Sequence, residues 1–268
     1  MTVLVAVLMS LATTADPVFN QRTQDFYADS PDSVNIADWA GRSTLRDALS
    51  WWYGPWIQRT GYYRPLSSWI IWIEYLLAGR SFQAFCAVSW LLHGLNGALL
   101  ALFALALFRH RPWPWAWALV AVALFNYRLG PAGPSWQPWP VSIGVVAWWP
   151  AQTDQLSLAA GLCALLLLDR YARLGSRADA VAASVLCLAS LLSKEMAVAL
   201  PLLGAALLAY RRALQAWRVP TVWAGMSVAL LVVRALAVPN AAGPSLSHFW
   251  PPYMARKLVW YSFERLYS

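Results

Sequence analysis

Residues 82–111 read FQAFCAVSWLLHGLNGALLALFALALFRHR, an apolar run with no charged side chain before Arg109. About twenty consecutive apolar residues are enough for a helix to cross the hydrocarbon core of a bilayer. The run ends in Arg109, His110 and Arg111, and short basic loops of membrane proteins gather on the cytoplasmic side. The stretch therefore predicts a membrane-spanning helix whose carboxyl end lies in the cytoplasm.

The composition of the whole chain agrees with this prediction. Of its 268 residues, 60% are hydrophobic and 12% are charged, and the mean hydropathy is +0.48. Soluble domains have about a quarter of their residues charged. Because apolar runs follow one another with short polar separators, we expect an all-α fold, a single polytopic helical bundle over residues 1–268 without a separate soluble domain.

Seven spans and the start of an eighth are expected along the chain. The first includes Val3–Ala12, which lacks the basic segment of a cleaved signal peptide and is interpreted as an uncleaved signal anchor. The expected spans cover residues 2–19, 84–108, 113–128, 154–169, 178–193, 195–210 and 219–238, and 255–268 begins the last.

Short basic loops set the expected orientation. Arginines follow the second, fourth and sixth spans, so the even-numbered spans end in the cytoplasm and the amino terminus is cytoplasmic. These loops and their contacts with anionic lipids explain the net charge of +8, and nucleic acid is not an expected partner. The outer face then receives residues 20–83, the Pro/Trp-rich loop 129–153, the turn at 193–195 and residues 239–254.

The long outer segment is expected to contain two helices at the membrane interface. Residues 43–56 have an amphipathic pattern, and Ser43 or Thr44 is placed to cap the first turn. Residues 66–79 are short for a span and carry Glu74 in the middle, so we expect an interfacial or half-inserted helix there. Pro65 is expected to be its first residue.

Lys194 and Glu195 lie where one expected span turns into the next. One interpretation is structural: Ser193 caps the next helix, Glu195 favours its positive end, and Lys194 extends toward lipid head groups. The other interpretation is that this helix start binds the phosphate of a lipid-linked substrate. Arg64 has the same two interpretations. Its guanidinium can stack on the preceding tyrosine pair as a structural contact, or it can bind a phosphate through two hydrogen bonds.

His93 and Asn96 lie three residues apart in the second span and therefore share one helix face. We expect them to hydrogen-bond to a neighbouring span. Asp154 has a structural explanation at the start of the fourth span, because the positive end of a helix favours a carboxylate.

An acidic cluster follows the first span on the outer face and consists of Asp25, Asp29 and Asp32. A carboxylate there can act as a general base or hold a divalent cation, and the alternative is a solvated polar loop. The three cysteines lie inside apolar runs without metal-ligand spacing, so no metal site is assigned to them. The sequence also lacks a phosphate-binding glycine loop, so soluble nucleotide chemistry has no support from a motif.

Four further segments follow one another along the chain: YYRPLSSWIIWIEYLLAG (62–79), FQAFCAVSWLLHGLNGALL (82–100), PVSIGVVAWWPAQTDQL (140–156) and LLSKEMAVALPLL (191–203). In this order they resemble the polytopic membrane glycosyltransferases of the GT-C superfamily. The likeness is greatest to polyprenyl- or dolichol-phosphate-mannose protein glycosyltransferases and to the transmembrane-and-tetratricopeptide O-mannosyltransferases. The matching positions are Arg64-Pro65, His93 and Asn96, Pro140, Val145, Trp148 and Asp154, and Ser193-Lys194-Glu195 with Pro201. The resemblance covers about residues 15–205 and implies a short or truncated member.

The resemblance implies transfer of a sugar from a polyprenyl-phosphate donor to a hydroxyl acceptor on the outer face of a membrane, expected to be a bacterial inner membrane. By position, Asp25 is the expected catalytic base and Asp29 its alternate. Arg64 and Lys194 are expected at the lipid phosphate. The substrate-binding residues implied in this way are Arg64, His93, Asn96, Asp154, Lys194 and Glu195. No organic cofactor is implied, and a divalent cation is left open.

A protein of another class fits part of the sequence: a non-catalytic GT-C-derived subunit or scaffold of a larger membrane complex. Asp25 and Asp29 lie four residues apart, where the family has an adjacent acidic pair. The 18 tryptophans provide lipid and partner contacts. The expected partners are membrane lipids and a polyprenyl-phosphate-linked sugar in the first case, and membrane proteins in the second.

Overall fold

The computed structural model describes residues 1–20, 30–58, 61–126 and 145–238. These residues form helices and turns with no strand among them, so the all-α class is confirmed. In chain order the helices are α1 (Thr2–Thr13), α2 (Asp16–Phe19), α4 (Pro31–Arg42), α5 (Leu45–Ser50), α6 (Pro65–Ala78), α7 (Phe82–Leu107), α8 (Pro114–Asn126), the 3-10 turn η1 (Trp149–Ala151), α10 (Gln152–Leu174), α11 (Arg177–Ser193), the 3-10 turn η2 (Glu195–Ala199), α12 (Leu200–Arg211), the 3-10 turn η3 (Leu214–Ala216) and α13 (Arg218–Ala237).

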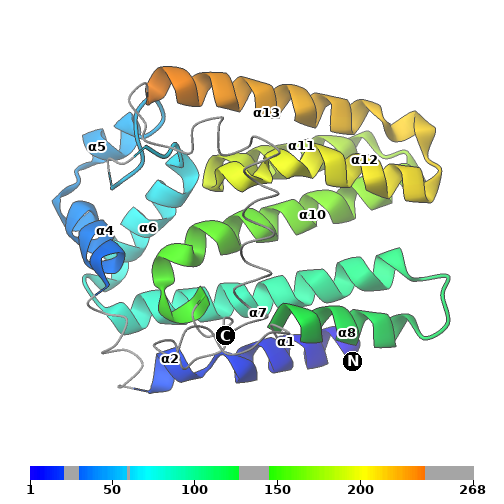
Figure 1. The fold of residues 1–268 in the computed structure, drawn as a ribbon, viewed down its shortest axis with the longest axis horizontal. Helices are drawn as coiled ribbons and strands as arrows, with labels where there is room; N and C mark the ends of the chain where they lie inside the picture. The colour runs from blue at the N-terminus through cyan, green and yellow to red at the C-terminus, as the bar shows by residue number, and fades with distance from the viewer. Residues whose placement is uncertain (21–29, 59–60, 127–144, 239–268) are drawn as a thin grey trace, which may run out of the picture.

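The long helices lie side by side as a bundle (Figure 1). α7 packs between α1 and α8 on one side and α10 on the other, and α10 packs in turn on α11. The shorter helices α4, α5 and α6 gather at one end, near the beginnings of α7 and α10 and the carboxyl end of α13 (Figure 1). The other end carries the turns that follow α7, α10 and α12.

Within the described residues, three helices are long and apolar enough to cross a membrane: α7, η1 continued by α10, and α13. They indicate an integral membrane protein. The helices α1, α6 and α8 are also apolar but have only 12, 14 and 13 residues. The count of seven or eight spans stays a prediction, and the last of these, residues 255–268, lies outside the described residues.

The first helix ends sooner than the span predicted over 2–19. α1 stops at Thr13, and the hydroxyl of Thr14 donates a hydrogen bond back to the carbonyl of Ser10 at 2.6 Å. Pro17 has no N–H to donate to the carbonyl of Thr13, so the α-helical hydrogen-bond ladder cannot continue through it. The chain resumes as the separate turn α2.

In the segment before α7, the described residues 30–58 and 61–81 contain three helices where the sequence predicts two. The additional helix is α4, which is capped by Ser30 and begins at Pro31. The helix predicted over 43–56 is shorter than expected, because α5 ends at Ser50. Thr44 caps α5 in a reciprocal pair of hydrogen bonds with Asp47, so one of the two predicted caps is confirmed. A location of these helices at a membrane interface stays a prediction.

Close contact between α1 and α7 depends on glycine. A Cβ added at Gly94 would lie 2.6 Å from the side chain of Leu11, and one at Gly97 would overlap the hydroxyl of Ser10. Small residues allow helix backbones to approach closely in membrane proteins, where packing rather than water exclusion holds helices together. These two glycines therefore fix the distance between the first helix and the rest of the bundle.

A buried ion cluster joins the carboxyl ends of α7, α10 and α12. Asp169 is 1% exposed and lies 2.6 Å from Arg211 Nε and 3.0 Å from Arg173 Nε. Arg211 Nη2 also donates to the carbonyl of Ala106, 2.6 Å away. The last carbonyls of a helix lack intrahelical partners, and a cation near them is favourable. The cluster therefore holds together the end of the bundle that carries the basic turns.

Candidate functional site

Two polar motifs that are far apart in sequence meet at the opposite end of the bundle, where α10 begins. Arg64 Nε lies 2.9 Å from Glu195 Oε2, and Glu195 Oε1 accepts a hydrogen bond from Tyr63 N at 3.2 Å. The guanidinium carbon of Arg64 lies 4.1 Å from the ring centre of Tyr62 and 5.1 Å from that of Trp56, so the predicted placement over aromatic rings is confirmed. Arg64 is only 8% exposed, so its charge lies inside the protein, where the carboxylate of Glu195 neutralises it.

Local structure before and after Arg64 positions this pair. α6 begins at Pro65, as predicted, since the missing proline N–H has no partner to lose at the first helical position. Ser67 donates to the carbonyl of Ser193 at 2.8 Å, which ties the start of α6 to the end of α11. Burial raises the pKa of the Tyr63 phenol, which donates a hydrogen bond to the carbonyl of Trp52 at 2.8 Å.

The turn between α11 and α12 directs Lys194 and Glu195 to different partners. Lys194 has an extended backbone, with φ −157° and ψ 139°, and the 3-10 turn η2 follows it. The helix predicted over 195–210 therefore begins as α-helix only at Leu200. The predicted cap is wrong as well, because the hydroxyl of Ser193 donates back to the carbonyl of Ala189 at 2.8 Å.

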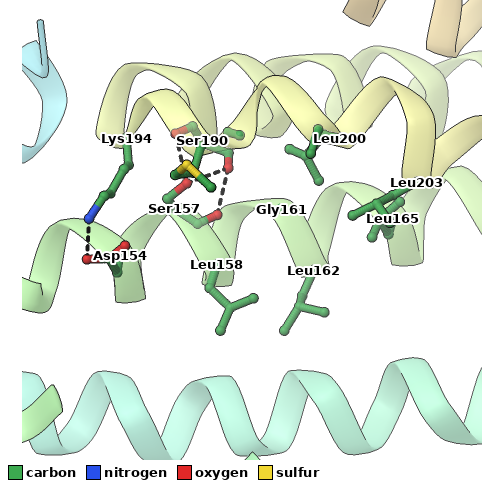
Figure 2. Close-up of a pocket in the computed structure, with 13 residues that line it drawn as sticks. Asp154, Ser157, Leu158, Gly161, Leu162, Leu165, Ser190, Lys194, Leu200 and Leu203 are labelled. Carbon is green, nitrogen blue, oxygen red and sulfur yellow. Dashed lines mark hydrogen bonds and ion pairs between the residues drawn. The ribbon is translucent and has the colours of Figure 1, made fainter. Parts of the chain in front are cut away.

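Lys194 points toward α10, where its Nζ forms an ion pair with Asp154 Oδ2 (Figure 2). Asp154 lies in the first turn of α10, as predicted for a carboxylate at a positive helix end. The side chains of Lys194 and Asp154 are 20% and 47% exposed, in contrast to the buried Arg64–Glu195 pair. Exposed ion pairs contribute about 0–1 kcal/mol, so this pair can exchange partners readily.

A cavity of about 240 Å³ opens beside this ion pair, between α10 and the η2–α12 segment (Figure 2). Its α10 wall includes Asp154, Leu158 and Leu162, which are four residues apart and share one helix face. Leu200 and Leu203 of α12 line it from the other side. The cavity thus has charge at one end and leucine side chains along its length, an arrangement suited to a molecule with an anionic head and a hydrocarbon chain.

His93 and Asn96 hydrogen-bond to neighbouring helices, as predicted, and neither lines the cavity. His93 Nε2 lies 2.9 Å from Asn126 Oδ1 in α8, and its ring stacks on Phe125 with ring centres 4.7 Å apart. Asn96 Nδ2 donates to the carbonyl of Gln155 in α10 at 3.0 Å. These contacts hold α7 against α8 and α10 and so support the bundle behind the site.

The expected base Asp25 and its alternate Asp29 lie outside the described residues. Asp32, the third member of the acidic cluster, is in the first turn of α4 and accepts a hydrogen bond from Gln58 Nε2 at 3.4 Å. In the part of the chain that the structure describes, no group of three or more His, Cys, Asp or Glu side chains could hold a metal ion. The three cysteines are unpaired.

Two charged residues near the cavity end of the bundle, Glu74 and Arg234, have contacts that were not predicted from the sequence. Both carboxyl oxygens of Glu74 in α6 are buried and form no hydrogen bond with the residues that the structure describes. Burial raises the pKa of Glu74 to about 7, and the nearby Gln152 amide has a smaller opposing effect. Arg234 in α13 donates from Nη2 to the carbonyl of Gly61 at 3.2 Å. A charged residue within an apolar run was the available signal for both.

No protein-family model matches the chain, and searches of curated proteins and of solved structures found no match. Two of the motif segments, 62–79 and 191–203, contact one another through the Arg64–Glu195 pair across 131 residues of sequence.

Proposed function

We propose that this protein is a GT-C-like integral membrane glycosyltransferase, which transfers a sugar from a polyprenyl-phosphate donor to a hydroxyl acceptor on the outer face of the membrane. The observation that carries the proposal is the cavity between α10 and α12, with a charged mouth and a leucine-lined interior. A lipid-linked phosphate has the same two parts. The four ordered motifs and the three membrane-length helices support the same assignment.

Lys194 is the proposed phosphate ligand. Its ammonium group lies at the cavity mouth in an exposed pair with Asp154, and a phosphate can take the place of that carboxylate at small cost. The isoprene chain would then pack against Leu158, Leu162 and Leu203. Burial of this apolar surface would contribute about 25 cal/mol for each Å² removed from water.

The proposed reaction breaks one carbon–oxygen bond and forms another. A base removes the proton of the acceptor hydroxyl while its oxygen attacks the anomeric carbon of the sugar. The bond between that carbon and the phosphate oxygen breaks, and its electron pair leaves with the polyprenyl phosphate. Lys194 stabilises the negative charge that develops on the phosphate. Asp25 is the proposed base and Asp29 its alternate, on the strength of their motif position.

Arg64 and Glu195 are proposed to position Lys194. The buried guanidinium of Arg64 already has a carboxylate and two aromatic rings as partners, and separating a buried ion pair costs about 3–5 kcal/mol. That cost makes Arg64 a poorer phosphate ligand than Lys194. His93 and Asn96 are proposed to act indirectly as well, through their contacts between α7 and its neighbours.

The proposed topology has seven or eight spans, a cytoplasmic amino terminus and the site on the outer face of a bacterial inner membrane. The distribution of arginines supports it, because Arg173 and Arg211 lie at the end of the bundle opposite the cavity. The helices α4, α5 and α6 would then cover the outer ends of the spans at the membrane interface.

A non-catalytic subunit of a membrane complex is the second candidate. It is favoured by the ion pairs, since Arg64 and Lys194 each have a carboxylate partner within the described ranges. Both cations are therefore balanced without an anionic ligand. A subunit would use these pairs to hold its helices together.

Transfer by the purified protein in nanodiscs tests the proposal, with polyprenyl-phosphate sugars as donors and hydroxyl-bearing peptides as acceptors. Lys194→Ala is expected to lower the turnover by about 10²–10³-fold, the usual loss when one preorganised group that stabilises developing charge is removed. The fold should be retained, because the pair with Asp154 is largely open to solvent.

Two matched variants accompany Lys194→Ala. Lys194→Arg is expected to keep part of the turnover because it keeps the charge. Arg177→Gln removes an exposed cation at the opposite end of the bundle and should leave the turnover unchanged. If no donor supports transfer and the native protein copurifies with a stoichiometric protein partner, the subunit is the better assignment.

A further inference from the structure

Arg234 carries a positive charge that lacks a carboxylate partner among the residues described. It is partly buried and makes one hydrogen bond, from Nη2 to the carbonyl of Gly61 at 3.2 Å, while its buried Nε–H has no acceptor. Arg211, by contrast, donates from Nε, Nη1 and Nη2 to Asp169 and two carbonyl groups. A guanidinium has five N–H donors, so most of those of Arg234 are available to an external acceptor.

The place of Arg234 in α13 corresponds to the depth of lipid phosphates. α13 has 20 residues and is about 30 Å long, close to the thickness of the hydrocarbon core of a bilayer. Arg218 begins this helix and Arg234 lies within its last turn, about 24 Å further along the axis, so the long side chains of the two arginines can reach the head groups of opposite membrane surfaces. Val228 and Leu231, which precede Arg234 along the helix, are 62% and 47% exposed, as expected for side chains that contact lipid chains.

The charge and shape of the Arg234 guanidinium favour a phosphate group as its ligand. Charged side chains in a membrane pair with an opposite charge or extend to the head groups, because an unpaired charge is costly there. The hydrogen bond to Gly61 holds the Arg234 side chain against the polypeptide and restricts such extension. A planar guanidinium binds a phosphate through two parallel, charge-assisted hydrogen bonds, which are about twice as strong as neutral ones.

We infer that Arg234 binds the phosphate group of a membrane lipid that packs against the Ala237 end of α13, at a site separate from the α10–α12 cavity. The hydrocarbon chain of this lipid lies along the exposed apolar side chains of α13 that precede Arg234, beside Val228 and Leu231. An anionic phospholipid and a polyprenyl phosphate both supply the required group. The inference does not depend on glycosyltransferase activity.

Lipid retention by the purified full-length protein tests this site. The protein is reconstituted in nanodiscs of phosphatidylcholine alone, with added phosphatidylglycerol, or with added undecaprenyl phosphate, and is then released into mild detergent. Native mass spectrometry counts the retained lipids and identifies them by mass. We expect the wild-type protein to retain phosphatidylglycerol or undecaprenyl phosphate, and the mass to show which of them supplies the phosphate. Arg234→Gln should retain about tenfold less, since hydrogen bonds to charged groups are strong.

Two further variants make the result specific to this arginine. Arg218→Gln, exposed at the other end of the same helix, should retain lipid as the wild-type protein does. Arg234→Lys keeps the charge but loses the planar fork, so its retention should be intermediate, and it decides the matter if Arg234→Gln does not fold. Equal retention by the wild-type protein and both Arg234 variants overturns the inference, as does a wild-type protein that retains neither added lipid.

Discussion

Replacing Glu195 by glutamine is expected to lower the free energy of unfolding by about 3–5 kcal/mol, because it leaves the buried guanidinium of Arg64 without a counter-charge. The two side chains are only 18% and 10% exposed, and their paired atoms lie 2.9 Å apart. Glu195 also accepts the backbone N–H of Tyr63, so the substitution weakens a second link between the same two segments. Unfolding by sodium dodecyl sulfate in mixed micelles, followed by circular dichroism, measures the loss.

Asp154→Asn is the matched control for Glu195→Gln. Asp154 is 47% exposed in its pair with Lys194, so the expected loss is at most about 1 kcal/mol. The double variant Arg64→Met with Glu195→Gln should recover much of the stability, because it removes the uncompensated buried charge and the glutamine oxygen can still accept the backbone N–H of Tyr63. If Glu195→Gln loses no more stability than Asp154→Asn, the two motifs are not joined by a buried pair.

Asp169→Asn is expected to have an effect of similar size, about 3–5 kcal/mol, at the opposite end of the bundle. The Asp169 side chain is 2% exposed and bonds to both Arg173 and Arg211. The asparagine amide oxygen can still accept a hydrogen bond and the carbonyls of Ala106 and Leu107 remain, but Arg211 loses its counter-charge. The carboxyl ends of α7, α10 and α12 then lose the group that joins them. The same detergent titration measures this loss.

Arg177→Gln provides the comparison for Asp169→Asn. Arg177 begins α11 at the same end of the bundle and is exposed. Substitutions of exposed residues change the free energy of unfolding by about 0.5 kcal/mol or less. A loss for Asp169→Asn as small as the loss for Arg177→Gln would show that water, rather than protein packing, balances the charges of the cluster.

Helix starts could be predicted from the sequence because their signals are local. Pro65 begins α6 and Thr44 caps α5, and both act through backbone groups within one turn. Helix ends were harder to predict from the sequence. α5 stops at Ser50, and Trp51 then packs into the core with Trp56 and Trp72, a tertiary contact that the amphipathic pattern over 43–56 does not encode.

The partners of the charged site residues could not be predicted. Lys194 and Glu195 are adjacent in sequence, yet one pairs with Asp154 in α10 and the other with Arg64 before α6. The extended backbone at Lys194 directs the two side chains to different helices, and the two residues alone do not predict this backbone conformation. The cavity could not be predicted from the sequence either, since it arises where α10 packs beside α12. The leucines that line its α10 wall do recur at a helical spacing that is visible in the sequence.

Photo-crosslinking to a lipid-linked phosphate most directly tests the central claim, that the cavity between α10 and α12 binds the donor lipid. The probe is a polyprenyl phosphate with a photoreactive group on its isoprene chain, reconstituted with the wild-type protein and with Lys194→Ala, and mass spectrometry locates the labelled residues. We expect labels at Leu158, Leu162 and Leu203 in the wild-type protein, and about tenfold less labelling in Lys194→Ala. Labels confined to other helices, or equal labelling of both proteins, would contradict the claim.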